Sequence, residues 1–313
     1  MASPRRLIPT LKHLSPRSLE NVSNISRASS PKTPNVLKTV KNENLLSPFN
    51  IDTPNRIRLL RNGLPKKHHP VLGTGAFGTV YKALYKGDQV AAKIIQRKLN
   101  DNEVINSEKH AAALRHANIV KILNIEQGSS LSLITMELCG TSLQDRLQDS
   151  ILLREKRVSI WRDIACALQF CHNFAVIHAD VKATNILMTA DDRAKLTDFG
   201  SSILIGEPHI STRPRGTPGY TAPEVLKGDV PTFAADVYSL GIVAWQMLSR
   251  KVPFHGLHSH TIIYISVKGT RPKSETLDDE FGGRYTELFK AAWSQNITDR
   301  PTLSEIINKL NLL

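Results

Sequence analysis

Four polar residues in the second half of the chain have the types and spacing that phosphoryl transfer requires. Asp180 can accept the proton of a hydroxyl group, and Lys182 can neutralise the charge of a phosphoryl group. Asn185 and Asp198 offer the oxygen ligands that Mg²⁺ prefers. Together they predict a site that transfers a phosphoryl group from ATP, with Mg²⁺, to a hydroxyl group.

A glycine cluster earlier in the chain supplies a second part of such a site. Gly73, Gly75 and Gly78 have the G-x-G-x-x-G spacing that lets backbone N–H groups approach phosphate oxygens. This motif also occurs in dinucleotide-binding folds, where a helix follows it, but here residues 79–85 alternate like a strand. We therefore predict a β-hairpin that covers the phosphates, with Lys93 at the end of its next strand as their cation.

Lys93 needs a carboxylate partner, and the predicted helix from Glu103 to Leu114 offers two. We prefer Glu108 for the ion pair. Glu103 is the competitor, although it suits the exposed first turn of a helix.

Residues 131–136 read as a strand, and residues 137–140 as a connector whose backbone would meet the adenine edge. The residues expected to bind ATP are Leu72, Gly73, Thr74, Gly75, Ala76, Phe77, Gly78, Thr79, Val80, Lys93, Glu137 and Cys139. From about Thr141 the chain becomes rich in predicted helices, including Trp161 to His172. We interpret His178 and Phe199 as packing residues that support the catalytic segments.

Composition is that of a globular enzyme-sized chain, with 313 residues of which 41% are hydrophobic. The three cysteines lack CxxC spacing, so neither a disulfide framework nor a zinc site is indicated. No apolar run is long enough for a membrane span, and residues 1–20 lack the apolar core of a signal peptide. We expect a cytoplasmic protein.

Most of the net charge of +13 belongs to the N-terminal segment, since residues 1–65 contribute +8. That segment is rich in Ser, Asn and Pro and has no sustained apolar period. We predict a disordered basic tail over residues 1–62 and a folded domain over residues 63–313. The charge does not indicate nucleic-acid binding, because no aromatic-interleaved basic module accompanies it.

Six proline-directed pairs lie in this tail, and each is a possible phosphorylation site or a simple turn signal. They are Ser3-Pro4, Ser15-Pro16, Ser30-Pro31, Thr33-Pro34, Ser47-Pro48 and Thr53-Pro54. Regulation by a proline-directed kinase is therefore one expectation for this segment.

The motif order resembles that of eukaryotic protein kinases over residues 66–313. Ala222-Pro223-Glu224 closes the segment that Asp198 opens. Asp236 matches the start of the family's long central helix, and Arg300 matches the late arginine that pairs with Glu224 in that family. The resemblance implies an α+β, two-lobed kinase fold: a β-rich N-lobe over about 66–137, a hinge over 137–140 and a helical C-lobe over 141–313. It also implies ATP and Mg²⁺ as cofactors and a protein substrate. The implied catalytic residues are Asp180, Lys182, Lys93 and Glu108, and the implied metal ligands are Asn185 and Asp198.

Three positions indicate the type of kinase and its regulation. Lys182 and Thr217 resemble the serine/threonine pattern. Ala179 replaces the family's usual arginine before the catalytic Asp, which normally holds a phosphorylated loop residue. We therefore expect activity without loop phosphorylation, although Ser211 and Thr212 could be modified and Arg213 or Arg215 could receive the phosphate.

Within the kinases the chain most resembles the Mos family, notably in residues 73–83, 226–229 and 235–253 and in its start, Met1 to Pro4. This resemblance implies a cytosolic kinase that acts on MAP kinase kinases in germ cells during oocyte meiosis. It also implies that phosphorylation of Ser3 slows degradation. Raf-like and other MAP kinase kinase kinases are the nearest rivals, and a catalytically silent pseudokinase scaffold is the alternative from another class.

Overall fold

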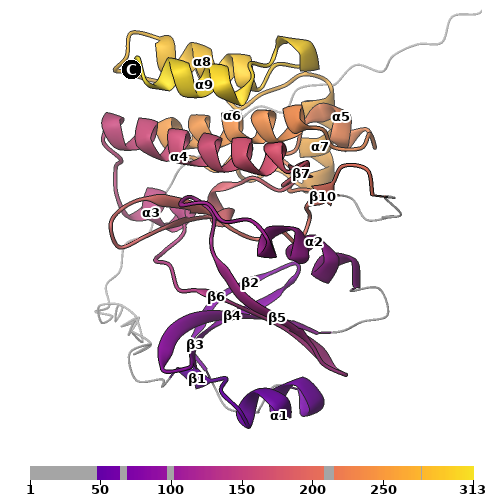
Figure 1. Cartoon of the computed structure of the whole chain (residues 1–313). Coiled ribbons are helices and arrows are strands. Elements are labelled where there is room, and N and C mark those ends of the chain that lie inside the picture. Colours follow the sequence, from indigo (N-terminus) through magenta and orange to yellow (C-terminus); the bar gives the residue numbers. More distant parts are fainter. Residues whose placement is uncertain (1–47, 64–68, 97–101, 208–214, 276) are drawn as a thin grey trace, which may run out of the picture. The chain divides into compact units, whose positions relative to one another are not determined.

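The computed structural model describes residues 48–63, 69–96, 102–207, 215–275 and 277–313. Its N-lobe is built on one mixed sheet (Figure 1). The strands of this sheet are β1 (Phe49–Asn50), β2 (Val71–Gly75), β3 (Gly78–Tyr85), β4 (Asp88–Gln96), β5 (Ile122–Gln127) and β6 (Leu131–Glu137). Their order is β1-β3-β4-β6-β5, with β2 also paired to β3. The β-hairpin predicted after the glycine cluster is thus present as β3 and β4.

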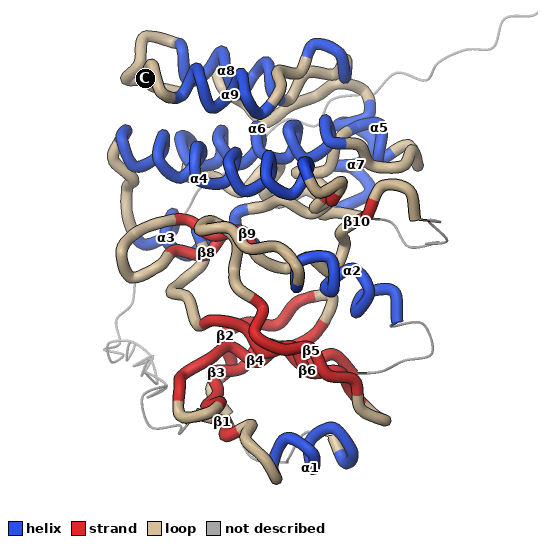
Figure 2. The backbone as a smooth tube through the Cα atoms, in the orientation of Figure 1, coloured by secondary structure: helices blue, strands red, loops and turns tan. Residues whose placement is uncertain are grey.

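Helix α2 (Asn102–Ala112) is the helix of the N-lobe that lies nearest the C-lobe (Figure 2). It packs on β5 and on the short strand β10 (Ile203–Leu204) of the C-lobe. Buried Val104 and Ile105 lie on the face of α2 that joins the main hydrophobic core. The packing of α2 therefore depends on both lobes.

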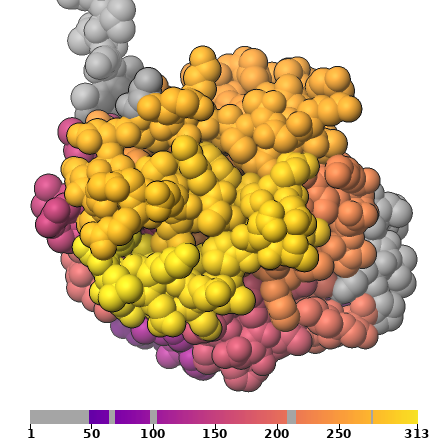
Figure 3. Space-filling model, turned by 90° about the horizontal axis from the view of Figure 1, so that it is seen from above, coloured from indigo at the N-terminus to yellow at the C-terminus, as the bar shows by residue number. Residues whose placement is uncertain are grey.

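The C-lobe is mostly helical, as its apolar periodicity predicts. Its helices are α3 (Leu143–Asp149), α4 (Arg154–Asn173), α5 (Pro223–Leu226), α6 (Phe233–Ser249), α7 (Ser259–Val267), α8 (Arg284–Ala292) and α9 (Leu303–Leu310). Short strands β7 (Val176–Ile177), β8 (Ile186–Met188) and β9 (Ala194–Leu196) frame the loop between α4 and the Asp198 segment. Helix α6 is buried over most of its length, and α4 and α8 pack against it. The orange and yellow C-terminal segments cover the end of this lobe (Figure 3). The predicted two-lobed α+β fold is confirmed.

The folded domain begins earlier than predicted, because residues 48–62, which were assigned to the disordered tail, are folded. This segment, which we call the strap (residues 48–63), forms β1 and α1 (Asn55–Asn62) and lies on the side of the sheet away from the C-lobe (Figure 1). Strand β1 pairs in parallel with β3, and Phe49, Ile51 and Leu59 join a second hydrophobic cluster with residues of β3, β4 and β6. The sequence shows no sustained apolar period here because three side chains of the segment are buried in the cluster, Leu60 packs against it, and the sheet supplies the rest. Residues 1–47 of the predicted tail lie outside the described residues.

Polar contacts hold α1 against β5, the β5–β6 turn and the end of β3. Arg56 pairs with Glu126 at 3.2 Å and donates a hydrogen bond to the Tyr85 hydroxyl at 3.1 Å. A Cβ at Gly128 would lie 2.1 Å from the Leu60 carbonyl oxygen. Only glycine allows this approach of the turn to the helix end.

The strap is expected to contribute to the stability of the N-lobe. Ile51 is fully buried (0% exposed), so Ile51→Ala should lower the free energy of unfolding by about 2–5 kcal/mol through lost burial and the cavity that remains. Ile57 lies in the same segment but is 44% exposed, and Ile57→Ala should change that free energy by no more than about 0.5 kcal/mol. Urea unfolding of both variants measures the difference; equal midpoints would show that the strap does not stabilise the lobe.

Among the described residues, the helices are too short or too polar for any of them to cross a lipid bilayer.

Candidate functional site

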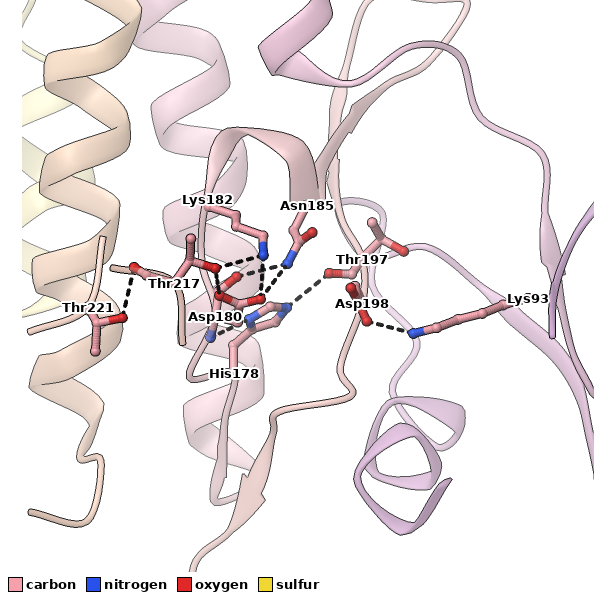
Figure 4. Close-up of polar contacts among 9 residues, drawn as sticks. All are labelled: Lys93, His178, Asp180, Lys182, Asn185, Thr197, Asp198, Thr217 and Thr221. Carbon is pink, nitrogen blue, oxygen red and sulfur yellow. Dashed lines mark hydrogen bonds and ion pairs between the residues drawn. The ribbon is translucent and has the colours of Figure 1, made fainter. Parts of the chain in front are cut away.

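The Asp180 carboxylate is surrounded by hydrogen-bond donors in the loop after β7 (Figure 4). Its Oδ2 accepts hydrogen bonds from Lys182 Nζ at 2.8 Å and from Asn185 Nδ2 at 3.2 Å, and its Oδ1 accepts one from Thr217 Oγ1 at 2.7 Å. The residue is 6% exposed. These contacts fix the orientation of a carboxylate that can accept the proton of a bound hydroxyl group.

Thr217 had no role in the chemistry predicted from the sequence. Lys182 Nζ also donates to its hydroxyl oxygen at 2.8 Å, so Thr217 joins both charged groups of the loop. The sequence signal for Thr217 was its match, together with Lys182, to the serine/threonine pattern. Its contact with Asp180 spans 37 residues and depends on tertiary structure.

Asp236 of α6 anchors the loop that carries Asp180. Its two carboxylate oxygens accept hydrogen bonds from the backbone N–H groups of His178 and Ala179, each at 2.9 Å, and His172 Nε2 lies 2.9 Å from Oδ2. Burial alone would raise the pKa of Asp236, but His172 and the backbone donor hold it below its ordinary value. Ala179 has a positive φ of 61°, so the anchor also fixes a backbone conformation that alanine disfavours.

His178 and Phe199 are packing residues, in agreement with their interpretation from sequence. His178 is fully buried, its Nε2 lies 3.0 Å from the Thr197 carbonyl oxygen, and its ring meets Phe199 edge to face at 4.7 Å. Phe199 is 2% exposed and belongs to the main core. This contact connects the loop to the residue that follows Asp198.

Lys93 is the centre of the charged contacts between the lobes. Its ammonium group hydrogen-bonds to Glu108 of α2, and it lies 2.6 Å from Asp198 Oδ1. Burial opposes the charge of Lys93, but the two carboxylates outweigh burial and raise its pKa above the ordinary value. Burial likewise opposes the charge of Asp198, and Lys93 holds the pKa of that carboxyl below its ordinary value. The structure thus pairs Lys93 with Glu108 and not with Glu103.

Asn185 and Asp198 fit a divalent metal by the chemistry of their remaining oxygens. Asn185 uses its side-chain N–H₂ group toward Asp180, and no hydrogen bond between described residues uses the side-chain oxygen Oδ1 of Asn185 or Oδ2 of Asp198. Across the described ranges no group of three His, Cys, Asp or Glu side chains could hold a metal by itself. A metal at these two residues would therefore complete its ligands with phosphate and water oxygens, as Mg²⁺ does in nucleotide sites. Such an ion would neutralise negative charge on the phosphates of ATP.

The glycine lid is formed by β2, the turn after it and the start of β3. Gly78 has a φ of 142°, and a Cβ there would lie 2.4 Å from the Ile94 carbonyl oxygen, so this position requires glycine. Leu72, Gly73, Thr74 and Gly75 lie in exposed β2, and Thr79 and Val80 lie in β3. Phe77, in the turn with Ala76, lies with its ring 5.7 Å from Lys93 Nζ. The lid therefore extends over the lysine that is expected to bind phosphate.

The connector between lobes follows β6. Glu137 ends that strand, and Lys195 of β9 pairs with its carboxylate at 2.7 Å, which ties the hinge to the C-lobe. Burial raises the pKa of Cys139 to about 11, so its thiol remains protonated near neutral pH. The Cys139 side chain packs against the main hydrophobic core, and the adenine contact expected here would come from backbone.

The segment from Asp198 to Glu224, which we call the activation segment, is fixed at its end. Arg300 makes two hydrogen bonds to Glu224, at 2.6 and 2.8 Å, and its guanidinium lies 5.1 Å from the Tyr238 ring centroid. The pairing implied by the family resemblance is therefore present. Ser211, Thr212 and Arg213 lie outside the described residues.

Arg215 and Glu103, which the sequence left as separate candidates, lie together. Arg215 Nη2 donates to Glu103 Oε1 at 2.8 Å. Glu103 is therefore more than a solvated helix-start residue, and the Arg215 guanidinium is engaged without a phosphate.

Several known proteins have sequences similar to that of this chain. The protein kinase domain family matches residues 67–310. The serine/threonine-protein kinase mos of Patiria pectinifera is 35% identical over 255 residues, which cover 76% of this chain and 72% of that protein. The proto-oncogene serine/threonine-protein kinase mos of Sus scrofa is 31% identical, with 77% and 79% of the two chains covered. A probable LIM domain-containing serine/threonine-protein kinase of Dictyostelium discoideum is 32% identical, but this chain spans only 38% of its length.

Proposed function

We propose that this chain, which belongs to the protein kinase family and is a serine/threonine kinase of the Mos type, phosphorylates a MAP kinase kinase and so starts a MAP kinase cascade. Two relatives that align with most of this chain are mos kinases, and the chain has Mos-like sequences at residues 73–83 and 235–253. We place this activity in the cytoplasm of germ cells during oocyte meiosis. The proposal of a MAP kinase kinase as substrate rests on this resemblance.

The single observation that carries the catalytic assignment is the set of hydrogen bonds around Asp180. Lys182 and Thr217 hold the carboxylate in place, and Asn185 connects it to the proposed Mg²⁺ site. In the reaction, Asp180 would accept the proton of the substrate hydroxyl while Lys182 neutralises the transferred phosphoryl group. Lys93, held by Glu108, would position the α- and β-phosphates of ATP.

A direct test uses the purified chain, [γ-³²P]ATP and a catalytically dead MAP kinase kinase. Transfer to serine or threonine should require Mg²⁺ and disappear with EDTA. Robust transfer to a generic substrate such as myelin basic protein, with none to a MAP kinase kinase, would retain the kinase and remove the proposed substrate. Transfer rates measured for a panel of MAP kinase kinases and for substrates of other kinase families would show whether the chain prefers MAP kinase kinases or has a broader specificity. Raf-like kinases remain the nearest rivals because they share the substrate class.

The structure offers no specific support for a pseudokinase, because Lys93, Glu108, Asp180, Asn185 and Asp198 are all present and mutually arranged. A silent scaffold would be expected to lack at least one of these groups.

We further propose that a proline-directed kinase regulates the N-terminal tail through Ser3. A phosphate there would add about two negative charges beside Arg5 and Arg6 and could mask the end from the degradation machinery. The expected result is a longer half-life for Ser3→Glu than for Ser3→Ala after synthesis is blocked, with equal kcat in vitro. Identical half-lives would remove this regulatory role.

A further inference from the structure

One face of α2 makes several contacts with the activation segment. Glu103, Ser107 and His110 are spaced by four and three residues and therefore lie on the same side of the helix. Ser107 Oγ donates to the Ser202 carbonyl oxygen at 3.0 Å, and Ser202 Oγ donates to the Ser107 carbonyl oxygen at 2.9 Å. His110 Nδ1 lies 3.0 Å from Ser202 Oγ. These contacts attach the middle and end of α2 to the start of the segment.

The first turn of α2 is attached by an ion pair instead. Arg215 donates from Nη2 to Glu103 at 2.8 Å and from Nη1 to the Ser201 carbonyl oxygen at 2.7 Å. Its side chain is 15% exposed. Arg215, which lies just before Thr217 in the activation segment, thus connects that part of the segment both to the start of α2 and to the start of the segment.

The position of α2 also determines whether Glu108 reaches Lys93. Glu108 lies five residues after Glu103 on the same rigid helix and reaches Lys93 from there. In kinases generally this lysine–glutamate pair must be in place for catalysis, and a phosphorylated loop residue commonly controls it through the position of this helix. The usual phosphate-binding arginine before the catalytic Asp is Ala179 in this chain, which has no cation to offer.

We propose that Arg215 is a positioning residue that replaces this phosphate-dependent contact. Its ion pair with Glu103 holds the first turn of α2 against the activation segment and so keeps Glu108 on Lys93 without a phosphorylated loop. The inference deepens the kinase activity stated above and rests on it. It gives a role to Arg215 and Glu103, neither of which is among the catalytic residues named above.

Charge reversal tests the pair. Arg215→Glu and Glu103→Arg should each lower kcat/KM by about 5- to 50-fold, because each places two like charges together at the start of α2. The double variant restores opposite charges and should recover most of the activity. Arg154→Glu with Glu155→Arg is the matched control, since it reverses an exposed ion pair on α4 and should leave activity unchanged.

Hydrogen exchange separates positioning from simple folding. In Arg215→Glu, amides of residues 102–112 should exchange faster while the C-lobe helices keep their protection and the melting temperature stays near that of the wild type. The same measurement in the Asp180→Asn background reads the position of α2 when no turnover occurs. Faster exchange there would support the positioning role of Arg215 even if the proposed substrate were wrong. A wild-type chain without any phosphoryl transfer would instead refute the proposed kinase function.

Loop phosphorylation is tested in the same series. Ser211→Ala with Thr212→Ala should retain substantial activity, and phosphatase treatment of the wild type should have little effect, because Arg215 is already paired. Complete loss in the folded Ala variant, with recovery on acidic replacement, would overturn the proposal. So would wild-type kcat/KM in Arg215→Glu, or a double reversal no better than the worse single variant.

Discussion

Asp180→Asn is expected to abolish phosphoryl transfer while ATP binding survives. The substitution replaces one carboxylate oxygen with an amide N–H₂ group that cannot accept a proton. Loss of a general base lowers the rate by on the order of 10²-fold or more. The glycine lid, Lys93 and Asp198 belong to other segments and remain in place. Single-turnover kinetics with [γ-³²P]ATP measure the rate, and fluorescence titration with an ATP analogue measures binding.

The control for this change is Asp192→Asn, the same carboxylate-to-amide substitution in the exposed turn between β8 and β9. It should leave kcat unchanged. If Asp180→Asn kept a near-normal kcat, with contaminating kinase excluded by mass spectrometry, the general base would have to be another group. Loss of both transfer and ATP binding would instead indicate a collapsed loop, since Lys182 and Thr217 both contact this carboxylate.

Much of the site could be predicted because its residue types are dictated by local chemistry. The glycine lid, the strand that carries Lys93 and the helix that carries Glu108 each have a local pattern, and their order restricts the fold to one that brings them together. The choice of Glu108 over Glu103 depended on which side of one helix faces the sheet. The structure pairs Lys93 with Glu108.

The parts that sequence reasoning missed depend on contacts between distant segments. Thr217 meets Asp180 across 37 residues, and Arg215 meets Glu103 across 112. Neither contact follows from a local sequence pattern, because each joins residues far apart in the sequence; in the folded chain the Arg215 side chain is 15% exposed and Thr217 is half-buried. The strap was missed for the same reason, since the apolar residues of this short segment become buried only when β3 offers its edge.

Lys93→Met and Glu108→Ala should each lower kcat/KM by about two orders of magnitude, which corresponds to roughly 2.7 kcal/mol of transition-state stabilisation. Lys93→Met removes the cation expected at the phosphates and leaves Glu108, 2% exposed, without its partner. Among the described residues, Glu108→Ala leaves Asp198 as the carboxylate partner of Lys93, and Asp198 is expected to bind metal. Either change therefore disrupts the same group of charges.

Because the two residues act as a unit, the double variant should lose little more than the worse single variant, with an interaction energy of about 1–3 kcal/mol in the double-mutant cycle. Lys156→Met with Asp192→Ala removes a more exposed ion pair, at 2.8 Å, and should leave kcat/KM unchanged. The raised pKa of Lys93 adds a pH test. The Lys93 ammonium group stays charged at every pH below the ordinary lysine pKa of about 10.4, and it loses its proton only at still higher pH. Activity between pH 6 and 9 should therefore show no titration from Lys93. Strictly additive losses in the cycle would mean that Glu108 does not hold Lys93 in solution, and Glu103 would then become the partner to test.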